Sequence, residues 1–84
     1  MNLEELREQI DKIDKEMMVL FKKRMGISLQ ISAYKKANDL PILDAKREFE
    51  IIFKKKKELN DDSLWPYYES FYKDLISLSK VYQK

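Results

Sequence analysis

One apolar stripe extends through the first two fifths of the sequence and constrains the fold more than any other feature. Its members recur at alternating gaps of three and four: Leu3, Leu6, Ile10, Ile13, Met17, Leu20, Arg24, Ile27, Ile31 and Tyr34. This spacing is typical of one face of a long α-helix. Asn2 and Glu5 resemble a capping box at its start, and Asn38 followed by Pro41 ends it. We therefore predict a single helix over residues 3–37.

The length of this helix limits the architecture. Its residues, at about 1.5 Å each, span roughly 52 Å, whereas a compact chain of 84 residues has a radius of gyration of about 12 Å. The helix must therefore project beyond any surface that its own chain can cover. An apolar stripe left in water favours aggregation. We expect a second, identical chain to cover the stripe, related to the first by a twofold axis.

The remaining sequence predicts two shorter helices. Asp44 is a suitable N-cap for a helix over residues 45–59. A polar turn of residues 60–63 separates it from a third helix over residues 64–83, in which Pro66 falls in the first turn and is tolerated. The expected buried face of this last helix is Leu64, Tyr68, Phe71, Tyr72, Leu75 and Ile76. The predicted fold class is all-α, with one domain over residues 1–84.

Composition excludes several classes of function. The chain has no cysteine and no histidine, which removes thiol nucleophiles and the commonest metal ligands, and we expect neither metal nor cofactor. Basic and acidic residues nearly cancel at 17 against 15, so we expect no nucleic-acid partner and interpret the run of lysines at 54–57 as solvated. No apolar run approaches the roughly 20 residues of a membrane span, and the N-terminus is unlike an export signal. We expect a cytoplasmic protein.

Polar side chains interrupt the expected apolar faces. Arg24 lies within the stripe, where it either fixes the register of an oligomer or binds an anion. Lys35 follows eleven residues later, about three turns on, so it points in nearly the same direction and lies about 16 Å away along the axis. A compact anionic metabolite could bridge the two side chains. Alternatively, Lys35 is a solvated lysine at a helix C-terminus, where its charge is mildly stabilising.

The other two helices carry polar candidates that also have simpler explanations. Ser79 and Gln83 continue the apolar face of the third helix, yet they lie where a chain end can fray. Glu48 lies in the first turn of the second helix, where a carboxylate suits the helix dipole. Asp44 could act as a cap alone. None of these residues indicates a function by itself.

Together, the polar residues match a known pattern. The matching segments are Leu6-Arg7-x-x-Ile10-Asp11-x-Ile13-Asp14, Leu20-x-x-x-Arg24, Ile31-x-x-Tyr34-Lys35, Pro41-Ile42-x-Asp44-x-x-Arg47-Glu48 and Ser79-x-x-x-Gln83. Over essentially the whole chain, they resemble the all-helical class of chorismate mutases. The resemblance implies an intertwined antiparallel homodimer of three-helix chains that rearranges chorismate to prephenate without a cofactor. One alternative register of the third helix would put Leu78 and Tyr82 in the places of Ser79 and Gln83.

The resemblance also implies a role for each residue. The implied catalytic residues are Lys35, Gln83 and Glu48. The implied substrate-binding residues are Arg24, Arg47, Asp44, Ser79 and Arg7 of the partner subunit. The sequence leaves two alternatives open: an isochorismate-pyruvate lyase on the same scaffold, and a helical dimerisation module without enzymatic activity.

The position of Arg7 agrees with the implied dimer. Arg7 lies about 25 Å from Arg24 along the helix, too far for both to hold one small ligand from the same chain. An antiparallel partner could bring its own Arg7 between Arg24 and Lys35. The twofold axis would then cross the long helix near residue 18, where Met17 and Met18 supply adaptable packing.

Overall fold

The computed structural model describes residues 2–41 and 44–83 and contains three helices: α1 (Leu3–Ala37), α2 (Ala45–Leu59) and α3 (Trp65–Gln83). The all-α prediction is confirmed, and the predicted ends agree except that α3 begins one residue later, at Trp65. Ile42, which belongs to one of the matching sequence segments, lies outside the described residues. None of the helices in the described part of the chain is long and apolar enough to cross a membrane.

Side-chain caps set the helix ends. The Asn2 side chain accepts a hydrogen bond from the Glu5 backbone N–H at 2.9 Å, and Asp44 accepts one from the Arg47 N–H at 3.0 Å. Asn60 ends α2 in the left-handed conformation, at φ 49°. Asp61 then accepts hydrogen bonds from Ser63 and Leu64, which hold the pKa of its carboxyl below the ordinary value. The polar residues of the predicted turn therefore fix the entry into α3.

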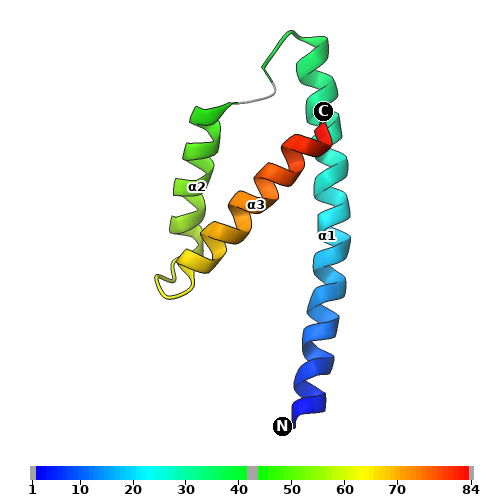
Figure 1. Cartoon of the computed structure of the whole chain (residues 1–84), viewed down its shortest axis with the longest axis vertical. Helices are drawn as coiled ribbons and strands as arrows, with labels where there is room; N and C mark the ends of the chain where they lie inside the picture. The colour runs from blue at the N-terminus through cyan, green and yellow to red at the C-terminus, as the bar shows by residue number, and fades with distance from the viewer. Residues whose placement is uncertain (1, 42–43, 84) are drawn as a thin grey trace.

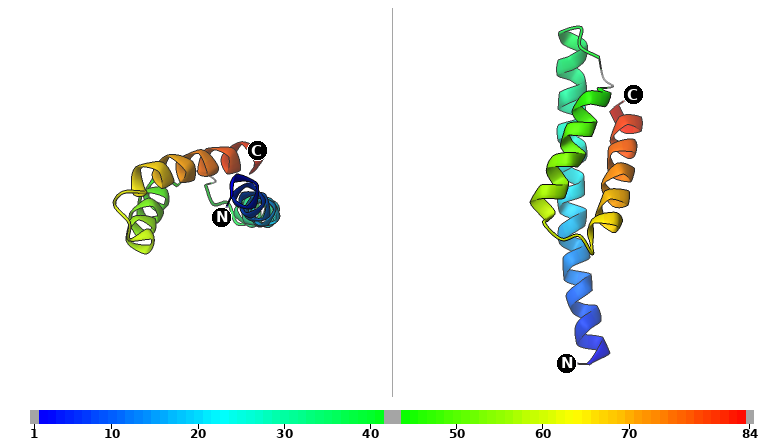
Figure 2. Two further views of the ribbon diagram at one scale, coloured as in Figure 1. Left: turned by 90° about the horizontal axis from the view of Figure 1, so that it is seen from below. Right: turned by 90° about the vertical axis from the view of Figure 1, so that its left-hand side faces the viewer.

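Helix α3 bridges the other two helices. It crosses α1 near its own C-terminus and packs against α2, whereas α1 and α2 do not pack against each other within the described residues (Figure 1). The N-terminal part of α1 projects alone beyond the other two helices, as the right-hand view in Figure 2 shows. The chain measures 54 × 26 × 17 Å, with a radius of gyration of 16.0 Å. A compact chain of this length would have a radius of about 12 Å.

The apolar members of the α1 stripe are exposed along its whole length. Their exposed fractions range from 44% at Leu6 to 64% at Tyr34, and Tyr72, at 9%, is the one apolar residue of the described chain that is buried. Burial of apolar surface is the main force that stabilises folds. Among the described residues of one copy, almost no apolar side chain is buried, and the stripe is left uncovered as the length argument predicted.

The prediction of a buried face on α3 is wrong for two of its residues in the single chain. Leu64 is 53% exposed and lies just before α3, where its carbonyl accepts the Tyr68 N–H at 3.0 Å. Phe71 is 48% exposed because it faces the open side of the α1–α3 crossing rather than a covered surface. Tyr68, Leu75 and Ile76 are half-buried.

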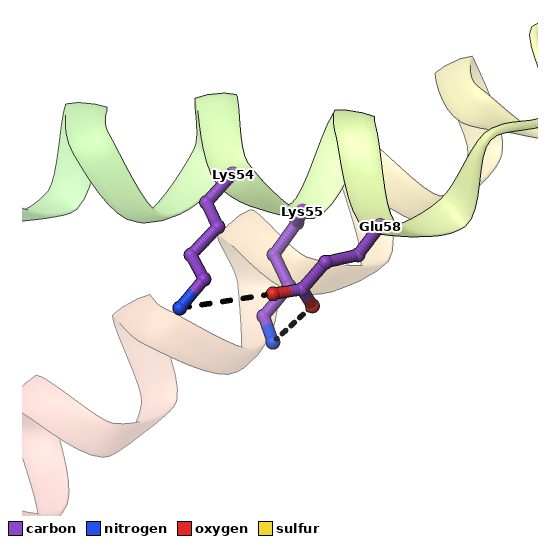
Figure 3. A network of polar contacts seen from close by, with 3 residues as sticks. All are labelled: Lys54, Lys55 and Glu58. Atoms are coloured by element: carbon purple, nitrogen blue, oxygen red, sulfur yellow. Dashed lines mark hydrogen bonds and ion pairs between the residues drawn. The ribbon is translucent and has the colours of Figure 1, made fainter.

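One lysine of the run at 54–57 is less solvated than predicted. Lys54 and Lys55 both approach the Glu58 carboxylate, at 3.9 and 3.2 Å (Figure 3). The Lys55 side chain is only 32% exposed and its ammonium lies 5.8 Å from the centre of the Tyr72 ring. The hydrogen bond to Glu58 raises the pKa of Lys55 above its ordinary value.

Replacing Gly26 with alanine should stabilise the protein. Gly26 lies inside α1, and an alanine Cβ at this position would have nothing within 4 Å, so the change adds helix propensity without a clash. We expect an increase of about 1 kcal/mol in the free energy of unfolding per chain, measured by urea denaturation. The reciprocal control, Ala33→Gly on the same helix, should lower it by a similar amount. A loss of stability in Gly26→Ala would contradict the prediction and indicate that another chain packs closely at this point.

Candidate active site

A set of small polar residues forms the crossing of α1 and α3. Ser28 and Ser32 lie one turn apart on α1 and are 7% and 3% exposed. The Ser32 hydroxyl donates to the Gln83 carbonyl at 3.0 Å, and the Gln83 side-chain amide donates to the Ser28 carbonyl at 3.0 Å. Small side chains let two helix backbones approach closely, and here the polar groups are paired across the contact. The crossing therefore holds the last turn of α3 against the C-terminal half of α1.

Arg24 is anchored one turn before this contact. It is half-buried, its guanidinium donates a hydrogen bond to the Ser79 hydroxyl, and it lies 5.8 Å from the centre of the Tyr72 ring. The Ser79 hydroxyl donates in turn to the Leu75 carbonyl at 3.0 Å. These contacts give a half-buried cation a defined position on the face that α1 turns toward α3.

The structure distinguishes between the two registers of α3. Ser79 is 7% exposed and contacts Arg24, and Gln83 contacts α1 as described above. Leu78 and Tyr82 are 55% and 50% exposed. Ser79 and Gln83 therefore lie toward α1 in this structure.

A largely apolar groove opens beside Arg24. Its volume is about 760 Å³, and α1, α2 and α3 all contribute to its walls, which include Met17, Phe21, Arg24, Lys55, Phe71, Tyr72 and Leu78. Its walls carry two cations, Arg24 and Lys55, and two carboxylates, Asp14 and Asp74. The mostly apolar walls suit an apolar partner segment.

Residues of α2 form a second cluster. Asp44 is occupied as the N-cap and Arg47 is exposed. Glu48 is half-buried, and its Oε1 atom lies 2.5 Å from the Lys80 ammonium of α3. The pair lines a smaller cleft of about 450 Å³ between α2 and α3. The structure therefore places Glu48 beside Lys80 rather than in direct contact with Arg24.

The two remaining candidates lie at opposite ends of α1. Lys35 is half-buried, and its spacing from Arg24 puts it in nearly the same direction about 16 Å further along the axis. Arg7 is exposed on the projecting half of the helix, about 25 Å from Arg24. One chain thus brings together Arg24, Ser79 and Gln83, but it does not bring Arg7 to them.

The chemistry available at this crossing is anion recognition. Arg24 supplies a guanidinium, Gln83 supplies an amide, and Lys35 adds an ammonium on the same helix face. Among residues 2–41 and 44–83, no group of three histidine, cysteine or carboxylate side chains could hold a metal ion. The residues favour binding and electrostatic stabilisation of a small polyanion.

Comparison with known proteins identifies the family of the chain. The family model for chorismate mutase type II matches residues 6–84. The chain belongs to the chorismate mutase type II family. A solved structure described as a conserved hypothetical protein from Pyrococcus furiosus is 34% identical, with a TM-score of 0.79 over 98% of this chain and 95% of that one. No curated protein matches the chain significantly.

Sequence reasoning missed two residues of this chorismate mutase domain. Ser32 carries the most buried polar side chain of the described residues, and Lys80 pairs with Glu48. A signal for Ser32 was present, because it follows Arg24 and Ser28 at steps of four on one helical face. Lys80 had no comparable signal, since its partner lies on another helix.

Removing the Ser79 hydroxyl should weaken the α1–α3 crossing. The Ser79→Ala change deletes the acceptor of a charge-assisted hydrogen bond from half-buried Arg24, and we expect a loss of about 1–2 kcal/mol in the free energy of unfolding. Ser77→Ala is the matched control, because Ser77 is exposed on the same helix and undergoes the same change in helix propensity. Equal denaturant midpoints for the two variants would contradict the assigned contact.

Proposed function

We propose that this protein is a chorismate mutase that rearranges chorismate to prephenate, as a cytoplasmic step of phenylalanine and tyrosine biosynthesis. The observation that carries the proposal is the cluster of Arg24, Ser79 and Gln83 at the α1–α3 crossing, in a chain of the chorismate mutase type II family. The catalytic unit is the single domain of residues 1–84, acting as an antiparallel homodimer.

Two features of α1 support the dimer. Its apolar stripe is exposed in the single chain, so a second copy has a large surface to bury. Its charges are also segregated: residues 3–20 contain six acidic and three basic residues, whereas residues 21–37 contain five basic and no acidic ones. Antiparallel pairing puts the acidic half of one helix against the basic half of the other, and parallel pairing would bring like charges together.

A residue of the partner subunit would complete the site. With a twofold axis near residue 18, Arg7 of the partner subunit reaches the stretch between Arg24 and Lys35. Arg24 and that arginine would hold the two carboxylates of the substrate, since guanidinium groups suit bidentate grips. Ser79 assists one carboxylate, for which its hydroxyl must turn from the Leu75 carbonyl to the ligand. Arg47, exposed near the start of α2, adds positive potential around the same ligand.

The reaction requires no acid, base or nucleophile from the protein. It is a pericyclic rearrangement with no proton transfer and no covalent intermediate, so the lack of histidine and cysteine is no obstacle. The flexible enolpyruvyl arm must fold over the ring before the bonds exchange. A site that holds both carboxylates selects this folded conformer and removes much of the entropic cost.

Charge develops on the ether oxygen as its bond to carbon lengthens. Lys35 and the Gln83 amide are the donors assigned to this oxygen, while Glu48, with support from Asp44, holds the ring hydroxyl. One preorganised donor contributes about 3–4 kcal/mol, and a millionfold acceleration requires about 8 kcal/mol. Two donors together with selection of the folded conformer are sufficient for an acceleration of this size.

The decisive test is the product. Purified protein is mixed with chorismate, and separately with isochorismate, and the products are separated by chromatography. Formation of prephenate from chorismate supports the proposal. Release of pyruvate from isochorismate without prephenate would instead indicate an isochorismate-pyruvate lyase on this scaffold. No turnover of either compound, with a dimer still present, would favour a helical dimerisation module.

Substitutions at the two ends of the anion site should have different kinetic effects. Lys35→Ala removes a donor aimed at the transition state, and we expect kcat to fall about 100- to 1,000-fold. Arg24→Ala removes a carboxylate grip, so KM should rise as well as kcat fall. Lys36→Ala, at the adjacent exposed position, is the control and should retain normal kinetics. Near-normal turnover in Lys35→Ala would remove Lys35 from its assigned role.

A further inference from the structure

The ion pair between Glu48 and Lys80 joins two helices at their ends. Glu48 lies in the first turn of α2 and Lys80 in the last turn of α3, with side chains 30% and 32% exposed. The described ion pairs of Glu58 and Glu69, by contrast, each form within one helix. Both helix dipoles favour the charges at these positions. The pair is therefore suited to fix the start of α2 against the end of α3.

The location of Lys80 connects this pair to the candidate active site. Its neighbour Ser79 is buried against Arg24, and Gln83 contacts α1 one turn later. Successive residues of a helix point about 100° apart, so one turn of α3 presents Ser79 to α1 and Lys80 to α2. The position of the Glu48 carboxylate relative to Arg24 is consequently set through α3.

The contact leaves Glu48 able to bind another group. The Lys80 ammonium contacts the Oε1 atom, and a carboxylate has a second oxygen that can accept a hydrogen bond. A hydroxyl of a ligand can use that oxygen while the ion pair stays intact. Lys80 can therefore orient Glu48 and still leave one carboxylate oxygen to accept a hydrogen bond from a ligand.

Electrostatics gives the pair a second role. A carboxylate near a ligand with two negative charges repels that ligand, and the repulsion is strong where water is partly excluded. An adjacent ammonium offsets the charge of Glu48, so the acid can act as a hydrogen-bond acceptor without lowering the affinity for an anion.

We propose that Lys80 is a positioning residue of the active site: it orients Glu48 toward the ring hydroxyl of the substrate and offsets the charge of that carboxylate. This inference rests on the proposed mutase function. It assigns a role to a residue outside the set expected from the sequence.

The test is a double-mutant cycle in steady-state kinetics. Lys80→Met should lower kcat/KM for chorismate about tenfold, mainly through a higher KM, because a charge-assisted contact and an offsetting charge are both lost. Lys80→Arg should restore kcat/KM to within about threefold of the wild-type value. In a Glu48→Gln background, Lys80→Met should lower kcat/KM by less than about twofold, since a neutral amide needs no counter-charge.

Lys73→Met is the matched control. Lys73 lies two turns earlier on the same face of α3 and borders the same cleft, but it pairs with Glu69 of its own helix at 3.8 Å. We expect its kcat/KM within about twofold of the wild-type value. Wild-type kinetics in Lys80→Met would overturn the inference. So would an equal loss in the Glu48→Gln background, because that result would show Lys80 acting independently of Glu48.

Thermal unfolding of the same four proteins of the cycle separates this inference from the proposed function. If wild-type protein fails to convert chorismate, the mutase proposal fails, but the coupling between Glu48 and Lys80 is still measured by the shifts in Tm. We expect the Tm loss from Lys80→Met to shrink in the Glu48→Gln background. Identical Tm losses in the wild-type and Glu48→Gln backgrounds would show that Glu48 and Lys80 do not form a stabilising ion pair.

Discussion

The length of α1 against the size of the chain is the constraint on which the structure depends. A helix of 35 residues extends along nearly the whole 54 Å dimension of the molecule, and among the described residues only α3 packs against part of it. The consequence is an exposed apolar stripe and a single buried apolar side chain, Tyr72, among the described residues. Folding and association are thus expected to be one process, because most of the stabilising burial would occur between chains.

Among the described residues of the single chain, the buried contacts between α1 and α3 are mostly polar. The α1–α3 crossing is built from Ser28, Ser32 and Gln83, and the neighbouring contact joins Arg24 to Ser79. Some of these groups are also assigned to the substrate in the proposed mechanism. The same residues would therefore hold the helices in position and recognise the ligand, so that ligand binding should also stabilise the crossing.

The sequence predicted the local structure closely and the contacts between helices less well. Periodicity located α1, and the Asn2 and Asp44 side chains marked helix starts because capping depends on residues only a few positions apart. Which residues of α3 face α1 could not be predicted from the sequence, because it depends on the length of the preceding turn. The structure shows that they are Ser79 and Gln83. Lys80 and the half-buried Lys55 could not be predicted, because their partners are set by how α3 crosses its neighbours. The Arg7 assignment stays a prediction.

Mixing inactive subunits tests the shared active site most directly. Arg7→Ala and Arg24→Ala chains are unfolded together in equal amounts and refolded, and chorismate conversion is compared with that of each variant refolded alone. A mixed dimer has one site with both arginines and one with neither. Half of the dimers are mixed, so we expect recovery of about one quarter of wild-type activity. No recovery beyond the separate variants, with mixed dimers demonstrated by mass, would show that the two arginines do not meet across subunits.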